Sequence, residues 1–394
     1  MNRAVEMDII KKDSEYIVNT YSRFPVCITS GKGALLYDDA GREYIDLGSG
    51  IAVNTFGAAD GEWAAAVATQ AAKLQHTSNL YYTEPCVKLA EMLCERTGME
   101  KVFFSNSGAE ANECAIKAAR RYAFKKYGDE SHSTIITFKN GFHGRTITTL
   151  AATGQDVFHT DFGPFTPGFV YADPNDPASV EKLAEEHGCA AIMFETIQGE
   201  GGVFELPGET IEAIKRTAEK YGLLIVIDEV QTGNGRTGKL FSYMHHGLEP
   251  DIVSTAKGLA GGLPLGATLF GKRTADVYTP GTHGSTFGGN PVCCAAAISV
   301  LSRITDDLLA DIERKGAYIR SALEGGKGVK SVSGRGLMLG VESERAVADV
   351  LADCRARGVL ALSAKTKVRL LPPYCITDEQ LEKAISILKE VCAK

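Results

Sequence analysis

Apolar and polar residues alternate with two different periods along the middle of the chain. Short apolar, β-branched runs are separated by longer segments with apolar residues every three or four positions. The runs predict strands at 102–104, 134–138, 190–194, 223–228, 252–255 and 267–270. The helical pattern covers 109–127, 179–187 and 209–221.

This strand–helix alternation predicts an α/β fold with a mostly parallel central sheet covered by helices on both faces. Ligands of such sheets bind beyond the carboxyl ends of the strands. After Pro291 the pattern changes to one long helix (292–323), strands near 336–341 and 368–371, and a closing helix from Asp378. We therefore expect an N-terminal segment (1–65) belonging to a smaller α+β domain, a large domain (66–290) and a C-terminal small domain (291–394).

Composition excludes several classes of protein. The 42 Lys and Arg against 49 Asp and Glu give a net charge of -7, which offers no electrostatic attraction for nucleic acid or an anionic membrane. The first sixteen residues lack the apolar stretch of a signal peptide, and the apolar run 292–301 is too short to span a bilayer. A cytoplasmic protein of two to three domains is expected.

The ten cysteines are scattered and form no C-x-x-C motif, so we expect reduced, mostly buried thiols. The eight histidines show no metal-ligand spacing, and no metal site is expected. Two glycine-rich stretches imitate nucleotide-binding motifs. Residues 233–238 match G-x-G-x-x-G without a helix opening from them, and both G-x-x-x-x-G-K matches lack the following Ser or Thr.

Two carboxylates, Asp228 and Glu229, end the apolar strand that begins at Leu223. They could cap the strand or hold a metal ion. Another interpretation concerns a pyridine cofactor: a buried carboxylate beside the ring nitrogen keeps that nitrogen protonated, and a protonated ring is an effective electron sink.

Such a site also needs a lysine and an anion-binding loop. Lys257 follows the strand after Asp228, where burial would lower its pKa and free its amine as a nucleophile. A lone lysine is more often a surface residue. Residues 105–111 turn a strand into a helix, whose N-terminus favours a phosphate. Ser107 with Glu110 equally fits a helix capping box.

These three elements, in this order, resemble the class-III aminotransferases of fold type I. The resemblance covers nearly the whole length and rests on an ordered set of motifs. They are SNLYY (78–82), NSGAEA (106–111), FHGRT (142–146), ETIQGEGG (195–202), DEVQTG (228–233), AKG (256–258), GSTFGGNP (284–291) and RLLPP (369–373).

The resemblance implies pyridoxal 5'-phosphate as cofactor and a role for each matching residue. Lys257 would bind the cofactor covalently and carry a proton, Asp228 would pair with the ring nitrogen, and Gln231 would hydrogen-bond the ring hydroxyl. Phe142 and Val230 would enclose the ring. The phosphate would be bound by Ser107, Gly108 and Ala109 and by Thr286 of a second subunit, which makes the protein a homodimer.

For the substrates, the resemblance implies that Arg145 holds the α-carboxylate of the amine donor. Arg369 would take the carboxylate of 2-oxoglutarate nearest the reacting carbon. Glu200 would neutralise Arg369 when the amine donor is bound, since an unpaired buried arginine is costly. Ser285 is also expected to contact substrate. Planar arginine forks suit bidentate carboxylate recognition.

The implied reaction moves the distal amino group of N2-acetyl-L-ornithine to 2-oxoglutarate in arginine biosynthesis. Sister enzymes that act on succinylornithine, ornithine, 4-aminobutyrate or N-succinyl-diaminopimelate share the cofactor residues. A racemase or decarboxylase of the same fold type is the alternative from another class. One departure from the family pattern is the stretch 57–62, where many relatives carry Gly-His-x-His-Pro.

Overall fold

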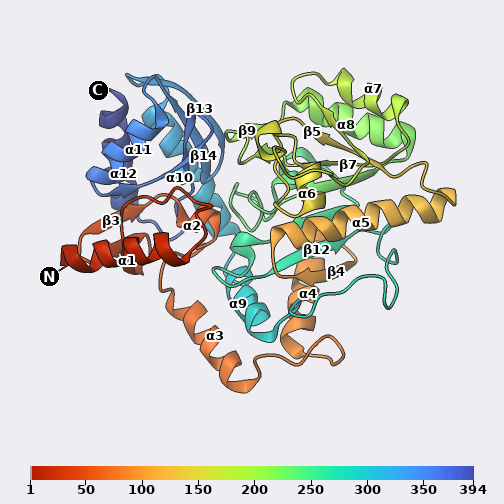
Figure 1. Ribbon diagram of the computed structural model, residues 1–394, viewed down its shortest axis with the longest axis horizontal. Coiled ribbons are helices and arrows are strands. Elements are labelled where there is room, and N and C mark those ends of the chain that lie inside the picture. The colour runs from red at the N-terminus through yellow and green to blue at the C-terminus, as the bar shows by residue number, and fades with distance from the viewer. Residues whose placement is uncertain (1) are drawn as a thin grey trace.

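The computed structural model describes the backbone of residues 2–394 and the side chains from Ile9 onward. Two lobes lie side by side, joined by α9 (Pro291–Leu301) and the loops around the middle of the molecule (Figure 1). One lobe contains a seven-stranded sheet. The other contains two four-stranded sheets and both α1 (Asn2–Tyr16) and α12 (Asp378–Cys392), from opposite ends of the chain.

The seven-stranded sheet has the order β4-β12-β11-β10-β7-β5-β6. Its strands are β4 (Lys101–Ser105), β5 (Thr134–Phe138), β6 (Phe169–Ala172), β7 (Cys189–Phe194), β10 (Leu224–Asp228), β11 (Ile252–Thr255) and β12 (Gly266–Phe270). Only β12 is antiparallel to its neighbours within this sheet. The expected mostly parallel sheet is confirmed, and it brings Asp228 and Thr255 to one edge.

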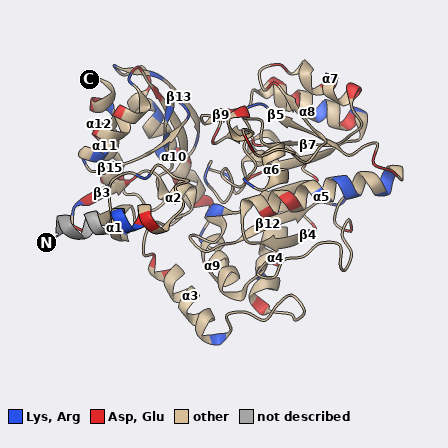
Figure 2. Ribbon diagram, in the orientation of Figure 1, with Lys and Arg blue, Asp and Glu red and all other residues tan. Residues whose placement is uncertain are grey.

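Successive strand residues pack on opposite faces of this sheet. Ile135, Met193 and Ile252 join an apolar cluster with α5 (Gly108–Tyr127). Their neighbours Ile136, Ile192 and Val253 join the cluster on the other face, with α7 (Ala178–Glu186) and α8 (Gly208–Tyr221). Both faces are buried, which is why these strands read as continuous apolar runs. In Figure 2, α5 carries acidic residues in its first half and basic residues near its end, matching its dipole.

The second lobe is built on two smaller sheets, β1-β2-β3-β15 and β13-β14-β17-β16. Strand β3 pairs in parallel with β15, so Ile45 lies opposite Val359. The strands are β1 (Ile28–Lys32), β2 (Leu35–Asp38), β3 (Glu43–Asp46), β13 (Val329–Arg335), β14 (Met338–Ser343), β15 (Val359–Leu360), β16 (Leu362–Ala364) and β17 (Lys367–Leu370). The domain boundaries at 65 and 290 stay predictions.

The remaining segments connect and cover these sheets. They are α2 (Ser49–Ala52), α3 (Gly61–Lys73), α4 (Glu84–Thr97), α6 (Ile147–Ala152), β8 (Ile197–Gln198), β9 (Phe204–Glu205), α10 (Asp306–Leu323), α11 (Val347–Ala356) and the short 3-10 turns η1 (Asp156–Phe158), η2 (Ser242–His246) and η3 (Lys257–Leu259).

The expectation of one helix over 292–323 is wrong, because the chain forms α9 and α10 with a break at 302–305. The Thr305 hydroxyl accepts a hydrogen bond from the Leu308 N–H, and Asp306 and Asp307 occupy the first turn of α10. A side-chain cap followed by two acidic residues starts a new helix. The closing helix from Asp378 is confirmed.

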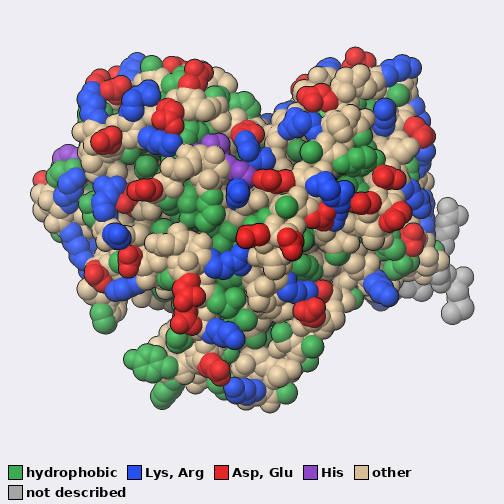
Figure 3. Space-filling model, turned by 180° about the vertical axis from the view of Figure 1, so that it is seen from behind, with side chains coloured by type: hydrophobic (Ala, Val, Ile, Leu, Met, Phe, Trp, Pro, Cys, Tyr) green, Lys and Arg blue, Asp and Glu red, His purple; other side chains and the backbone are tan. Residues whose placement is uncertain are grey.

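Positive and negative side chains are interspersed over the face seen in Figure 3. Within the part of the chain that the structure describes, no helix is both long and apolar enough to cross a membrane.

Candidate active site

A cavity of about 590 Å³ lies where the carboxyl ends of the large sheet face the second lobe. The sequence-predicted residues that line it are Ser107, Gly108, Ala109, Phe142, Arg145, Asp228, Val230, Gln231 and Lys257. They come from loops that follow β4, β5, β10 and β11, which meet at this edge of the sheet.

The Asp228 carboxylate is buried at the end of β10 and accepts hydrogen bonds on both oxygens. Asn112 Nδ2 and His143 Nδ1 each donate to Oδ2 over 2.8 Å, and the Val230 N–H donates to Oδ1 over 2.9 Å. Asn112 is itself fixed, since Nδ2 also donates to the His143 carbonyl. Asp228 is thereby held in one orientation.

Charge around Asp228 is set by two further buried groups. Burial acts to lower the pKa of His143, but the hydrogen bond to Asp228 and the charges of Asp228 and Glu195 together outweigh it, and the net shift is upward. Burial, reinforced by the Asp228 charge, raises the pKa of Glu195 to about 7. Glu195 accepts the N–H groups of Phe142 and Gly199, tying the two loops on either side of the cavity.

The neighbouring Glu229 points away from Asp228. Its oxygens accept the Thr232 hydroxyl and the Tyr243 N–H, and burial raises its pKa to about 7. The two carboxylates therefore do not form a metal site. Among the described residues, no cluster of three or more His, Cys, Asp or Glu side chains suited to a metal ion occurs.

Lys257 follows β11 with a φ of 43°, a left-handed conformation that is uncommon for a lysine. The surrounding structure holds it there: Asn234 Nδ2 donates to Thr255 Oγ1 and to the Ala256 carbonyl directly before it. Burial lowers the pKa of Lys257, against the opposing effects of Glu200 and Asp228. Lys257 therefore loses its proton more readily than an ordinary lysine.

The start of α5 borders the same cavity. Ser107 caps the helix by accepting the Glu110 N–H, but Glu110 accepts the N–H of Asn106 and not that of Ser107, so only the serine half of the expected capping box forms. The N–H groups of Gly108 and Ala109 precede any intrahelical acceptor. A Cβ on Gly108 would lie 2.6 Å from Val230 Cγ1, so only glycine fits between these segments.

Arg369 lies on β17 of the second lobe and is 3% exposed. Its Nη1 donates to Glu200 Oε1 over 2.5 Å and to Gln231 Oε1 over 3.1 Å. Gln231 borders the cavity, so the Arg369–Glu200 pair stands directly behind its wall. In this structure the Gln231 side-chain oxygen accepts a hydrogen bond from Arg369.

Arg145 is exposed at the opposite side, with its guanidinium 4.1 Å from the ring centre of Phe158 and 5.5 Å from that of Phe142. The two rings hold the guanidinium while leaving its donors accessible.

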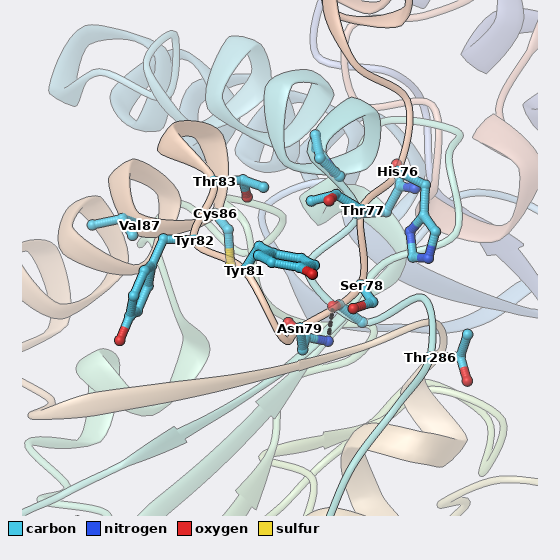
Figure 4. A pocket seen from close by; sticks show the side chains of 14 residues that line it. His76, Thr77, Ser78, Asn79, Tyr81, Tyr82, Thr83, Cys86, Val87 and Thr286 are labelled. Carbon is cyan, nitrogen blue, oxygen red and sulfur yellow. Dashed lines mark hydrogen bonds between the residues drawn. The ribbon is translucent and has the colours of Figure 1, made fainter.

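Ser285 and Thr286 do not line this cavity. The Ser285 hydroxyl accepts a hydrogen bond from Asn106 Nδ2, next to the start of α5. Thr286 borders a separate cavity of about 230 Å³, with Tyr81 and Tyr82. Figure 4 shows the Asn79 amide of that cavity reaching the backbone of the segment that carries Thr286. The expected contacts of Ser285 with substrate and of Thr286 with cofactor stay predictions.

Sequence reasoning missed several residues of the site. Asn112, His143 and Glu195 lie within or next to the quoted motifs, yet nothing in the pattern shows that they meet at Asp228. Tyr21 and Val53 reach the cavity from the N-terminal segment, about which the motifs say nothing. In the divergent stretch 57–62, Asp60 caps α3 by accepting the Trp63 N–H.

Comparison with known proteins gives consistent matches. A family model described as Aminotransferase class-III matches residues 16–392. The acetylornithine aminotransferase of Haemophilus ducreyi is 50% identical over 390 residues, 98% of this chain and 99% of that protein. That of Bacillus subtilis is 42% identical and covers 96% of this chain and 97% of that protein.

Solved structures agree. The ornithine aminotransferase of Toxoplasma gondii has a TM-score of 0.94 and 34% identity, covering 98% of this chain and 94% of that one. The acetylornithine aminotransferase of Elizabethkingia anophelis has a TM-score of 0.88 and 33% identity, covering 98% of both chains.

Proposed function

The chain belongs to the class-III aminotransferases of fold type I, and from that premise we propose that it transfers the distal amino group of N2-acetyl-L-ornithine to 2-oxoglutarate. The products are N-acetyl-L-glutamate 5-semialdehyde and L-glutamate, as a step of arginine biosynthesis. The two half-reactions share one site in turn. The observation that carries the proposal is the Arg369–Glu200 pair behind the Lys257 cavity, since a site for two different substrates needs a carboxylate site that can be neutralised.

Pyridoxal 5'-phosphate is the cofactor of this family, and the cavity fits it. Only a glycine, Gly108, fits between α5 and Val230. The buried carboxylate of Asp228 ends β10, and Lys257, whose pKa is lowered, follows the neighbouring strand β11. When bound, the cofactor supplies an aldehyde and a ring that withdraws electrons from the substrate carbon. Ser107, Gly108 and Ala109 would hold its phosphate, and Phe142 and Val230 would enclose its ring.

Lys257 is the base in this proposal. With the cofactor bound, Nζ, whose pKa is lowered, would hold the cofactor's aldehyde carbon, and the free amine would take a proton from the substrate carbon and return it. Asp228, fixed in one orientation by hydrogen bonds to both of its oxygens, would pair with the ring nitrogen. Gln231 would turn from Arg369 to the ring hydroxyl.

Substrates are distinguished by the two arginines. Arg145 would bind the α-carboxylate of acetylornithine near the mouth of the cavity. Arg369 would bind the carboxylate of 2-oxoglutarate next to the reacting carbon, after Glu200 has moved away. While the amine donor is bound, Glu200 neutralises Arg369, which avoids an unpaired buried cation.

We further propose a homodimer located in the cytoplasm. Thr286 is exposed and stands outside the Lys257 cavity, and Leu80, Tyr81, Tyr82 and Phe287 near it are also exposed. An exposed group of large apolar side chains favours contact with another subunit. In such a dimer Thr286 would reach the phosphate bound by the partner.

Ornithine is the second candidate for the amine donor, because an ornithine aminotransferase is among the structures most similar to this one. A single-turnover absorbance experiment separates the donors. The purified holoenzyme is mixed in turn with acetylornithine, succinylornithine, ornithine and 4-aminobutyrate while the visible band of the bound cofactor is followed.

We expect the band to bleach fastest with acetylornithine and to return when 2-oxoglutarate is added. Faster bleaching by another amine would move the substrate to that amine. A protein that shows no visible band after incubation with pyridoxal phosphate would contradict the proposal as a whole.

A further inference from the structure

The segment Gly233–Gly238, which imitates a dinucleotide-binding motif in sequence, forms a tight loop between the two lobes. Asn234, Gly235 and Gly238 have φ values of 58°, 93° and 91°. The loop closes on itself through hydrogen bonds from the Gly235 N–H to Leu240 and from the Gly238 N–H to Gly235. The glycines allow the backbone to turn tightly, and the loop presents the side chain of Arg236.

Arg236 reaches from the large lobe to the end of a strand pair in the second lobe. It is 1% exposed, and its Nη1 donates to the carbonyls of Leu337 (3.2 Å) and Pro372 (2.5 Å). Its own carbonyl accepts the Leu337 N–H, and its guanidinium lies 4.6 Å from the ring centre of Tyr374. Both the backbone and the side chain of Arg236 therefore hydrogen-bond to the same end of a sheet in the second lobe.

That place is the end of the β14–β17 pair nearest to Arg369. Leu337 directly precedes β14, and Pro372 follows β17 by two residues. Because the two strands are antiparallel, these ends are adjacent, and within the pair Arg369 lies opposite Gly340. One guanidinium group thus fixes both strand ends a few residues from Arg369.

Burying an arginine costs free energy, because its charged group loses contact with water. Nε and Nη2 of Arg236 have no hydrogen-bond acceptor among the described residues, and burial lowers the pKa of the group. An apolar side chain would pack there without the desolvation penalty of a cation. The two carbonyl contacts are what an apolar side chain could not provide.

The same loop touches the other parts of the site. Gln231, five residues before Arg236, accepts a hydrogen bond from the head of Arg369. Asn234 donates to the Ala256 carbonyl beside Lys257. The segment 231–236 thus contacts the head of Arg369, the strand that carries Arg369, and the flank of Lys257.

We propose that Arg236 is a positioning residue for keto-acid recognition: it fixes the β14–β17 end so that the Arg369 guanidinium stands where a dicarboxylate substrate needs it. This inference rests on the proposed function. Arg145 is held by Phe142 and Phe158 in the large lobe, so the amine donor does not depend on Arg236 in the same way.

The test compares Arg236→Met with a matched control, Arg320→Met. Arg320, on α10, also donates to two backbone carbonyls of the second lobe, those of Val332 and Gly334, but on β13, which β14 separates from the strand of Arg369. Each half-reaction is measured separately with acetylornithine and with 2-oxoglutarate. Equilibrium binding of glutarate, an unreactive dicarboxylate, gives a readout that requires no turnover, and butyrate serves as the monocarboxylate reference.

For Arg236→Met we expect the KM for 2-oxoglutarate to rise and the affinity for glutarate to fall about tenfold or more, since misplacing a binding group by an ångström has effects of this size. The acetylornithine half-reaction and butyrate binding should change less than about threefold. Arg320→Met should leave all four quantities near the wild-type values.

Equal losses in both half-reactions, or the same pattern in Arg320→Met, would overturn the proposal. If Arg236→Met does not fold, Arg236→Lys decides the matter, since it keeps the charge but loses the planar fork. If Arg236→Lys leaves the KM for 2-oxoglutarate unchanged, the proposal is also overturned. A wild-type enzyme that does not use 2-oxoglutarate would instead contradict the proposed function.

Discussion

The two ends of the cavity hold their charged groups in different ways. At the cofactor end, Asp228 receives three hydrogen bonds on its two oxygens, from α5, from the loop after β5 and from its own loop. At the carboxylate end, Arg369 uses a single nitrogen, Nη1, toward two flexible side chains, and its Nε has no acceptor among the described residues.

This difference matches what each group has to do. A group that must keep its place through the whole reaction is best held by many fixed donors. A charge that must change partners between substrates needs a contact that can be replaced. The strand that carries Arg369 is paired on both sides, with β14 and β16, whereas the partners of its Nη1 are side chains, which a substrate carboxylate could replace.

The largest effect is expected from Lys257→Ala, which removes the cofactor end's base. Loss of a positioned general base lowers the rate by about 10²- to 10⁴-fold, and loss of covalent attachment adds to this. We expect no multiple turnover in a coupled assay with acetylornithine and 2-oxoglutarate.

Lys101→Ala is a suitable control, because Lys101 is exposed and pairs only with Asp276 at the surface. It should keep wild-type activity. Appreciable multiple turnover by Lys257→Ala would contradict the assignment of the base.

A smaller effect is expected at the carboxylate end. Arg369→Ala should slow the 2-oxoglutarate half-reaction by about 10- to 100-fold, because a charge-assisted hydrogen bond contributes about 1.5–3 kcal/mol. The acetylornithine half-reaction should suffer much less. Single-turnover rates measure both.

Arg145→Ala provides the complementary variant and should mainly impair acetylornithine. If Arg369→Ala slowed both half-reactions equally, the carboxylate end would not distinguish the substrates and the comparison would fail.

The smallest effect concerns Glu229, the buried carboxyl behind Asp228. Its pKa of about 7 exceeds the ordinary 4.5, so the folded state binds the proton more tightly. Its contribution to stability is full below about pH 4.5 and is lost as pH rises to about 7, by as much as about 3 kcal/mol.

Glu229→Gln cannot titrate, so the decline in its free energy of unfolding between pH 5 and 8 should be smaller than in the wild type, with only the part due to Glu195 remaining, as measured by urea denaturation. The exposed Glu249→Gln should retain the decline. Parallel pH curves for wild type and Glu229→Gln would show that Glu229 does not titrate as described.

Much of the large lobe could be predicted from the sequence, because its strands are buried on both faces and produce unbroken apolar runs. Thr134–Phe138 and Ile252–Thr255 were predicted to the residue. Asp228 and Lys257 could be identified since each directly follows such a run.

Other features depend on contacts that a local pattern does not contain. The break at 302–305 rests on one hydroxyl cap. The edge strand β6 is a partly buried apolar run of only four residues, and it was not among the strands predicted from the sequence. Asn112 and His143 meet Asp228 across 116 and 85 residues, and only the folded chain brings them there.

The parallel pairing of β3 with β15 has a consequence for the order in which the molecule can be assembled. The N-terminal sheet receives its fourth strand only from Val359–Leu360, more than three hundred residues later in the chain. During synthesis β1, β2 and β3 therefore emerge long before their last neighbour exists, with the edge of β3 open to other strands. Closing so long a loop makes this step late and slow. A protein still growing on the ribosome thus exposes the open edge of Glu43–Asp46 to pairing with other chains.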